Sequence, residues 1–220
     1  MLSNYIETLL LAIIQGISEF IPVSSSAHLI ILSTLAEFNT ASLEVDVSLH
    51  LGSLLAIIVY FRNDLKHIFK KREILYLIIL GSLPLLIVGY ILHSTGLISL
   101  LRNLEIIAWT TLIFGILLYF SDQSKVTRNF NNEINFKNIF IIGIFQVLAL
   151  IPGVSRSGIV ITSGRLLKFD RYDSSKISFL LSIPALAGAS FLSLKDVFTN
   201  DANFNSLIIL SVFLSFIFSY

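Results

Sequence analysis

The sequence predicts an all-α integral membrane protein, a polytopic helical bundle that forms one domain over residues 1–220. Two re-entrant helical hairpins in an inverted-topology repeat are part of this prediction. Of the 220 residues, 55% are apolar and only 13% are charged, and the mean hydropathy is +0.86, which is too apolar for a soluble domain. Long apolar runs alternate with polar, helix-breaking stretches, and basic residues are restricted to a few loops.

Eight apolar runs predict the helices of the bundle. They cover residues 5–21, 27–36, 47–61, 74–92, 104–120, 139–151, 177–194 and 207–220. The runs 74–92 and 104–120 are long enough to cross a bilayer as ordinary helices, and 177–194 is nearly so, since about 20 apolar residues span the hydrocarbon. The run 47–61 is short, but its flanks can extend it.

Two stretches do not fit a simple spanning helix. Residues 5–36 pass from an apolar helix into Gly, Ser, Glu and Pro and then three consecutive serines, and residues 139–167 contain a similar interruption around Pro152. Helix-broken backbone at membrane depth requires protein partners or a water-filled cavity, because lipid offers none. We therefore expect two re-entrant hairpins whose tips face a site.

The placement of basic residues orients these hairpins. The chain has no Lys or Arg before Arg62, whereas residues 62–73, which we interpret as a loop, hold five. By the positive-inside rule this loop is cytoplasmic, and so is the basic loop 121–138. The basic residues after 164 also lie inside only if 139–167 is re-entrant. The first hairpin then enters from outside and the second from inside, as in inverted repeats.

A trace of duplication supports the repeat. Gln15 followed by Val23–Ala27 matches Gln146 followed by Val154–Gly158 at a constant offset of 131, and residues 81–86 echo 181–186 more weakly. The matches fall on the two predicted tips.

The side chains at the two tips indicate phosphoryl transfer. An arginine between serines at the start of a helix offers guanidinium, hydroxyl and backbone N–H donors, which together suit a phosphate group. The first tip supplies a carboxylate, hydroxyls and an imidazole for nucleophilic and proton-transfer work. The predicted catalytic residues are Glu19, Ser25, His28 and Arg156, and the predicted substrate-binding residues are Gln15, Ser24, Ser26, Ser155 and Ser157.

Each residue also has a simpler interpretation. The serines after Pro22 can be a helix cap, His28 can bond a neighbouring helix, and Glu19 can be an interfacial charge. Arg156 can pair with Glu19 purely structurally. For His50, a packing role and a role in the site are equally consistent with the sequence.

Four segments resemble the undecaprenyl-pyrophosphate phosphatase family associated with bacitracin resistance. They are Gln15–His28, Leu49–Ser53, Pro152–Gly158 and Ser178–Pro184, and the resemblance covers nearly the whole chain in the same order. It implies a multi-pass enzyme of the bacterial inner membrane that removes the terminal phosphate of undecaprenyl diphosphate, with its site towards the outer face. The lipid product is the carrier that cell-wall synthesis reuses.

The resemblance also implies roles. Ser25 matches the proposed nucleophile, His28 the motif histidine, Arg156 the phosphate-binding arginine and Glu19 an acidic position. Many relatives have Glu at the position of Gln15. A divalent cation, Mg²⁺ or Ca²⁺, is implied as cofactor, with Glu19 as a ligand. Whether Ser25 or an activated water attacks the phosphate stays open.

The expected partners are the polyprenyl diphosphate substrate and membrane lipids. The net charge of +1 gives no sign of nucleic acid, and a homodimer is an open alternative. The alternative function is a polyprenyl-phosphate flippase or another transporter built on inverted repeats. The resemblance implies further helical sequence beyond residue 220. We consider three explanations for the shorter length of this sequence: a natural short form, a truncation, and a partner subunit that supplies the missing part.

Overall fold

The helices of the computed structural model follow the predicted apolar runs closely. The structure describes residues 2–40, 43–130, 134–199 and 206–220. Within these ranges the secondary structure is helical apart from an isolated bridge between Arg128 and Phe169, which confirms the all-α class. The helices are α1 (Leu2–Ser18), α2 (Ser25–Leu35), α3 (Leu43–Tyr60), α4 (Arg62–Lys70), α5 (Arg72–Ser94), α6 (Leu97–Leu100), α7 (Leu104–Asp122), α9 (Phe136–Val147), the 3₁₀ turn η1 (Leu148–Leu150), α10 (Arg156–Leu166), α11 (Arg171–Thr199) and α12 (Ser206–Ser219).

Within the described residues, three helices have the length and apolar composition of membrane spans. They are α5, α7 and the Arg171–Leu192 part of α11, and they correspond to the three runs that the sequence marks as long enough, or nearly so, to cross a bilayer. Only small fractions of α5 and α7 are buried inside the protein, so most of their apolar surface faces outwards, as it does in lipid.

The interpretation of residues 62–73 as a loop was wrong, because most of this segment is the helix α4. Ile68 is buried in the core and Leu65 is half-buried on one side of the helix, while Arg62, Lys66 and Lys70 are exposed. A short amphipathic helix of this kind has too few apolar residues to appear as an apolar run. The basic residues on its exposed face are the ones that the charge pattern of the sequence identified.

The first polar stretch folds as a helix–turn–helix. Helix α1 ends at Ser18 and α2 begins at Ser25, with Pro22 in the turn, where it cannot donate a helical hydrogen bond. Ser24 precedes α2 with a φ of 63°, a left-handed conformation that is uncommon for a residue other than glycine. Such conformations are concentrated at functional sites.

The second polar stretch folds in the same way. Helix α9 runs through η1 into a turn that contains Pro152 and Gly153, and α10 begins at Arg156. Gly153 has a φ of 92° and lies against Thr110 and Ile107 of α7. A side chain at residue 153 would be strained by the backbone and would collide with α7, so the tight turn requires glycine.

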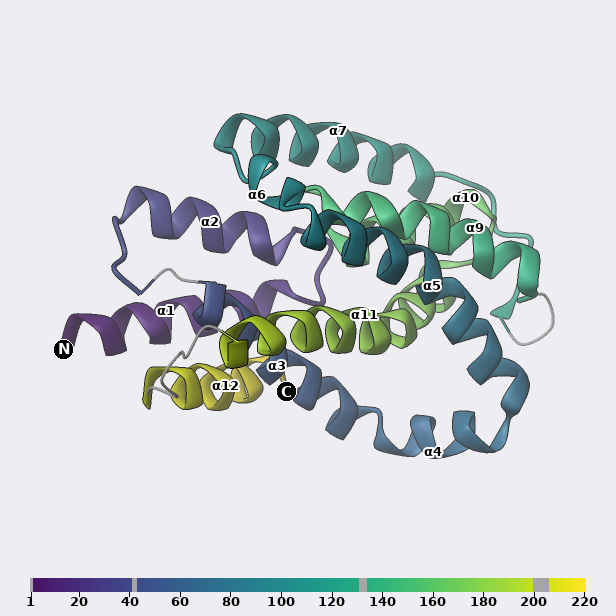
Figure 1. Cartoon of the computed structure of the whole chain (residues 1–220). Coiled ribbons are helices and arrows are strands. Elements are labelled where there is room, and N and C mark those ends of the chain that lie inside the picture. The colour runs from purple at the N-terminus through teal and green to yellow at the C-terminus, as the bar shows by residue number, and fades with distance from the viewer. Residues whose placement is uncertain (1, 41–42, 131–133, 200–205) are drawn as a thin grey trace.

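The two hairpins approach each other from opposite ends of the bundle. In Figure 1 the α1–α2 pair opens at the end where the N-terminus lies, and the α9–α10 pair opens at the end where α4 lies. Their tips meet in the middle: Ser157 at the start of α10 donates to the backbone carbonyl of Ile21 in the first turn, at 2.9 Å. Helices α3, α5 and α11 run past this meeting point and enclose it.

Helix α12 packs closely against α3 and α1, although its apolar run is short. A Cβ added at Gly52 of α3 would lie 2.7 Å from Cβ of Ser215 and would also meet the α12 backbone. The hydroxyl of Ser53 completes the contact, with Ser215 Oγ at 3.2 Å and Ser219 Oγ at 2.9 Å. Small residues at helix contacts allow this close approach in membrane proteins.

We expect Gly52→Ala to lower the thermal stability of the purified protein by several degrees, because the added methyl group forces α12 away from α3. Gly115→Ala is the matched control, since a Cβ at Gly115 in α7 meets nothing within 4 Å. Its unfolding temperature should stay unchanged or rise slightly. Melting in detergent, followed by size-exclusion chromatography, measures both. Equal effects of the two substitutions would contradict the close α3–α12 contact.

Candidate active site

The meeting point of the hairpins contains a buried carboxylate. Glu19 lies in the turn after α1, and its side chain is only 4% exposed. A charge in this position needs partners, because burying it alone costs several kcal/mol. Glu19 receives them from both hairpins.

Both oxygens of Glu19 accept strong hydrogen bonds. Arg156 Nη2 donates to Oε1 at 2.8 Å, Ser25 Oγ donates to Oε2 at 2.6 Å, and Gln15 Nε2 donates to Oε2 at 2.9 Å. His50 Nε2 lies 3.8 Å from Oε2. The pairing of Glu19 with Arg156, which the sequence offered as a structural alternative, is therefore present, and it joins the two hairpins.

Gln15 is held in turn by Ser53 of α3. Its Nε2 also approaches Ser53 Oγ at 3.3 Å, and Ser53 bonds the serines of α12. Gln15 is fully buried, and it is absent from the wall of the cavity described below. The amide therefore positions Glu19 from behind, and the binding role predicted for Gln15 is not one of direct contact with this cavity.

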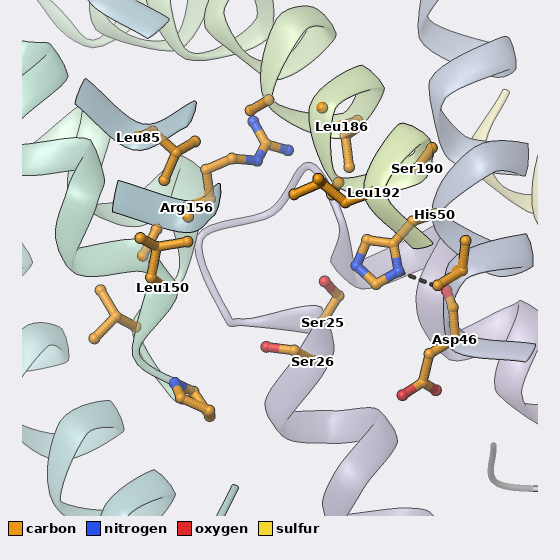
Figure 2. A pocket seen from close by; sticks show the side chains of 18 of the residues that line it. Ser25, Ser26, Asp46, His50, Leu85, Leu150, Arg156, Leu186, Ser190 and Leu192 are labelled. Carbon is orange, nitrogen blue, oxygen red and sulfur yellow. Dashed lines mark hydrogen bonds between the residues drawn. The ribbon is translucent and has the colours of Figure 1, made fainter. Parts of the chain in front are cut away.

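A cavity of about 340 Å³ opens in front of these residues. Five of the predicted site residues line it together with Glu19: Ser24, Ser25, Ser26, Ser155 and Arg156. Figure 2 shows Arg156 facing Ser25 and Ser26 across the cavity, with His50 on a third side. One end of the cavity is therefore polar and draws on both hairpins.

The remaining wall is mostly apolar. Leucines of α5, α11 and η1 form it, namely Leu85, Leu86, Leu150, Leu186 and Leu192. At the rim, Arg102 Nη2 pairs with Asp46 Oδ2 at 2.8 Å. A ligand that fits this cavity has a small anionic group and an apolar portion.

The polar end is built to receive an anion. Arg156 lines the cavity, and its Nη1 is buried and has no acceptor within the described part of the chain, so the protein leaves this end of the guanidinium without a partner. A buried donor without a partner is costly. An anionic oxygen in the cavity would satisfy it.

Two helix N-termini point to the same place. Helices α2 and α10 both begin at the cavity, because their first residues, Ser25 and Arg156, line it, and each helix has 11 residues. The hydroxyl of Ser155 caps α10 by accepting from Gly158 N, whereas the hydroxyl of Ser24 makes no capping bond. The cap interpretation of the first serines is therefore wrong for the Ser24 side chain. The uncapped N–H groups of α2 favour a bound anion.

Two other predicted residues lie outside the cavity. His28 is exposed on α2, and its Nδ1 lies 2.8 Å from the carbonyl oxygen of Ser24. Ser157 is occupied by the Ile21 carbonyl and by Ser155 Oγ, so it links the hairpins. The catalytic role of His28 and the binding role of Ser157 stay predictions.

His50 is the residue that the sequence left undecided. It lies on α3, lines the cavity and has a side chain that is 24% exposed. The sequence signal was an ionisable residue within an apolar helix, which marks a functional site by default. No periodicity showed which face of α3 would be turned to the hairpins.

A cation bound directly to Glu19 does not fit the observed donor set. Both oxygens are engaged by arginine, serine and glutamine donors, and Gln15 presents its N–H group rather than its oxygen to Glu19. Hard cations prefer several free oxygen ligands. The described residues also contain no group of three or more His, Asp or Glu side chains that could hold a metal ion.

Comparison with known proteins identifies the family. The family model described as "Bacitracin resistance protein BacA" matches residues 8–220. An undecaprenyl-diphosphatase of Pelagibacter ubique is 58% identical, over the whole chain and 86% of the relative. An undecaprenyl-diphosphatase of Elusimicrobium minutum is 38% identical, over 98% of the chain and 85% of the relative. The chain belongs to the bacitracin resistance protein BacA family, and it is a multi-pass membrane protein.

Proposed function

We propose that this protein hydrolyses undecaprenyl diphosphate to undecaprenyl phosphate and inorganic phosphate. The reaction recycles the lipid carrier for cell-wall synthesis and gives bacitracin resistance. Family membership and the names of the relatives support this activity. The observation that carries it is the hydrogen bond from Ser25 to Glu19 at the polar end of a largely apolar cavity.

The two parts of this substrate fit different parts of the cavity. The diphosphate fits the polar end, where Arg156 Nη1 and the first N–H groups of α2 are available to its oxygens. The first prenyl units fit against the leucines of α5 and α11. The rest of the chain passes between helices into the bilayer, because no cavity of this size holds an undecaprenyl group.

The hydroxyl of Ser25 is placed to attack the terminal phosphorus. Its proton already points to Glu19 Oε2 at 2.6 Å, so the carboxylate accepts that proton as the new bond between oxygen and phosphorus forms. The bridging P–O bond breaks, and undecaprenyl phosphate leaves. Arg156 stabilises the charge on the transferred phosphoryl group, as guanidinium groups do in other phosphoryl transfers.

This arrangement favours hydrolysis over transport. A transporter needs a binding site for the phosphate, which Arg156 and the helix N-termini would supply. It has no use for a buried carboxylate that receives the proton of a serine hydroxyl. The flippase alternative is therefore not favoured over hydrolysis by any contact described above.

The divalent cation stays a prediction. Because the oxygens of Glu19 are engaged by protein donors, we place no cation on this residue. Mg²⁺ or Ca²⁺ would instead enter with the diphosphate, whose oxygens are the harder and more numerous ligands. The predicted homodimer likewise stays a prediction.

The two helical hairpins are re-entrant and form an inverted repeat. The offset of 131 that relates the two sequence motifs also relates Ser24 to Ser155 and α2 to α10, each a helix of 11 residues. The two hairpins open at opposite ends of the bundle (Figure 1). Polar turns that meet each other inside the bundle satisfy the requirement that broken backbone be shielded from lipid.

The orientation follows from the basic loops. Helix α4 and the loops beside α9 and α10 lie at one end of the bundle, and they hold most of the basic residues. This end faces the cytoplasm of the inner membrane. The rim of the cavity, with Asp46 and Arg102, then lies towards the outer face.

We expect Ser25→Ala to reduce phosphate release from undecaprenyl diphosphate by at least about 10³-fold, because the nucleophile is lost. Ser26→Ala is the matched control, since Ser26 also lines the cavity but its side chain, among the described residues, bonds Ser24 Oγ alone, at 3.4 Å. Its activity should fall less than about tenfold. Phosphate assays of purified protein, with Mg²⁺ or Ca²⁺ present, measure both. If wild-type protein releases no phosphate, the proposed function is wrong.

We expect a cysteine at Lys70 to be shielded from an impermeant maleimide in intact spheroplasts and to react after lysis. Leu100 lies at the other end of the bundle, and the residue is 73% exposed. Leu100→Cys should therefore react in intact spheroplasts. Each labelling is unambiguous because the sequence contains no cysteine. Labelling of Lys70→Cys from outside would overturn the orientation.

A further inference from the structure

One ionisable group at the cavity has no part in the first step. His50 lines the cavity opposite Arg156 and beside Ser25 (Figure 2). Its Nδ1 lies 2.7 Å from the backbone carbonyl oxygen of Asp46, one turn earlier on α3. A carbonyl oxygen can only accept, so Nδ1 carries the hydrogen in the neutral ring.

This hydrogen bond fixes the chemistry of the other ring nitrogen. With the hydrogen on Nδ1, Nε2 has a free lone pair and is a proton acceptor. Nε2 lies 3.8 Å from Glu19 Oε2, too far for a hydrogen bond. No protein donor within the described part of the chain is recorded on Nε2, so its lone pair is available to a water molecule in the cavity.

We propose that His50 activates the water that hydrolyses phosphorylated Ser25. The inference rests on the proposed function, in which Ser25 attacks first. Ser25 Oγ and His50 Nε2 approach the same oxygen of Glu19, at 2.6 Å and 3.8 Å. A water on His50 Nε2 is therefore close to a phosphoryl group on Ser25.

The second step balances with groups present in the cavity. The water oxygen bonds to phosphorus, and the bond between phosphorus and Ser25 Oγ breaks. One proton of the water moves to His50 Nε2, and Ser25 Oγ takes back the proton that Glu19 received in the first step. Inorganic phosphate leaves, and His50 then loses its proton to bulk water. As Glu19 returns its proton to Ser25 Oγ it becomes a carboxylate again, and its negative charge then stabilises the positive charge on His50.

His93 provides a comparison within the same cavity. It lies near the end of α5 and also lines the cavity, but neither proposed step uses it. A substitution by Gln removes the imidazole of either histidine and keeps an amide of similar length.

The test follows both steps of the reaction with undecaprenyl diphosphate labelled in the terminal phosphate. For His50→Gln we expect a first turnover that releases undecaprenyl phosphate and leaves labelled phosphate on Ser25. Steady-state phosphate release should fall about 10²-fold or more. For His93→Gln we expect both quantities within about threefold of wild type. Added imidazole should speed dephosphorylation of a His50→Ala protein, because imidazole fits the vacated space.

Two results would overturn the proposal while the proposed function stands. One is a His50→Gln protein that keeps wild-type steady-state release. The other is a slowed His50→Gln protein that carries no label, which would place His50 in the first step or in packing only. Absence of phosphate release by wild-type protein would instead contradict the proposed function, so the two failures are distinguishable. Failure of added imidazole to speed dephosphorylation of the His50→Ala protein would also contradict the role proposed for His50.

Discussion

The structure depends on the burial of one carboxylate, Glu19. A nearly buried charge is stable only when several donors are fixed around it, and here both hairpins supply them. Gln15 and Ser25 belong to the first hairpin, close to Glu19 in the sequence, whereas Arg156 belongs to the second, 137 residues away. The ion pair with Arg156 ties the two hairpins together, so the same contact that stabilises the fold also assembles the cavity.

The surrounding packing serves this arrangement. Helix α12 approaches α3 closely enough for its serines to hold Ser53, and Ser53 holds Gln15 against Glu19. On the opposite side, Ser157 fixes the second turn to the first through the Ile21 carbonyl. These buried polar contacts orient side chains that an apolar interface would leave free to rotate. The rigid site then presents one guanidinium N–H group and uncapped backbone N–H groups to a phosphate.

Much of this could be predicted from the sequence, and the exceptions have physical causes. Apolar runs and polar interruptions depend on local composition, so the long apolar helices and the two helix–turn–helix units were predicted well. Helix α4 was missed because its apolar side is too short to form a run. His28 and His50 both lie in helices, but which one faces the cavity depends on how α2 and α3 are rotated against their neighbours. That rotation is set by tertiary packing, as is the turning of Ser157 towards Ile21.

The most direct test of this account is the binding of inorganic diphosphate to the purified protein, measured by isothermal titration calorimetry on Arg156→Gln and Arg102→Gln. Arg156 has a buried N–H group without an acceptor at the polar end, whereas Arg102 lies at the rim, paired with Asp46. The account predicts that Arg156→Gln weakens diphosphate binding at least about tenfold, since a charge-assisted bond is lost, and that Arg102→Gln changes it less than about threefold. Equal effects of the two substitutions, or unchanged binding by Arg156→Gln, would contradict it.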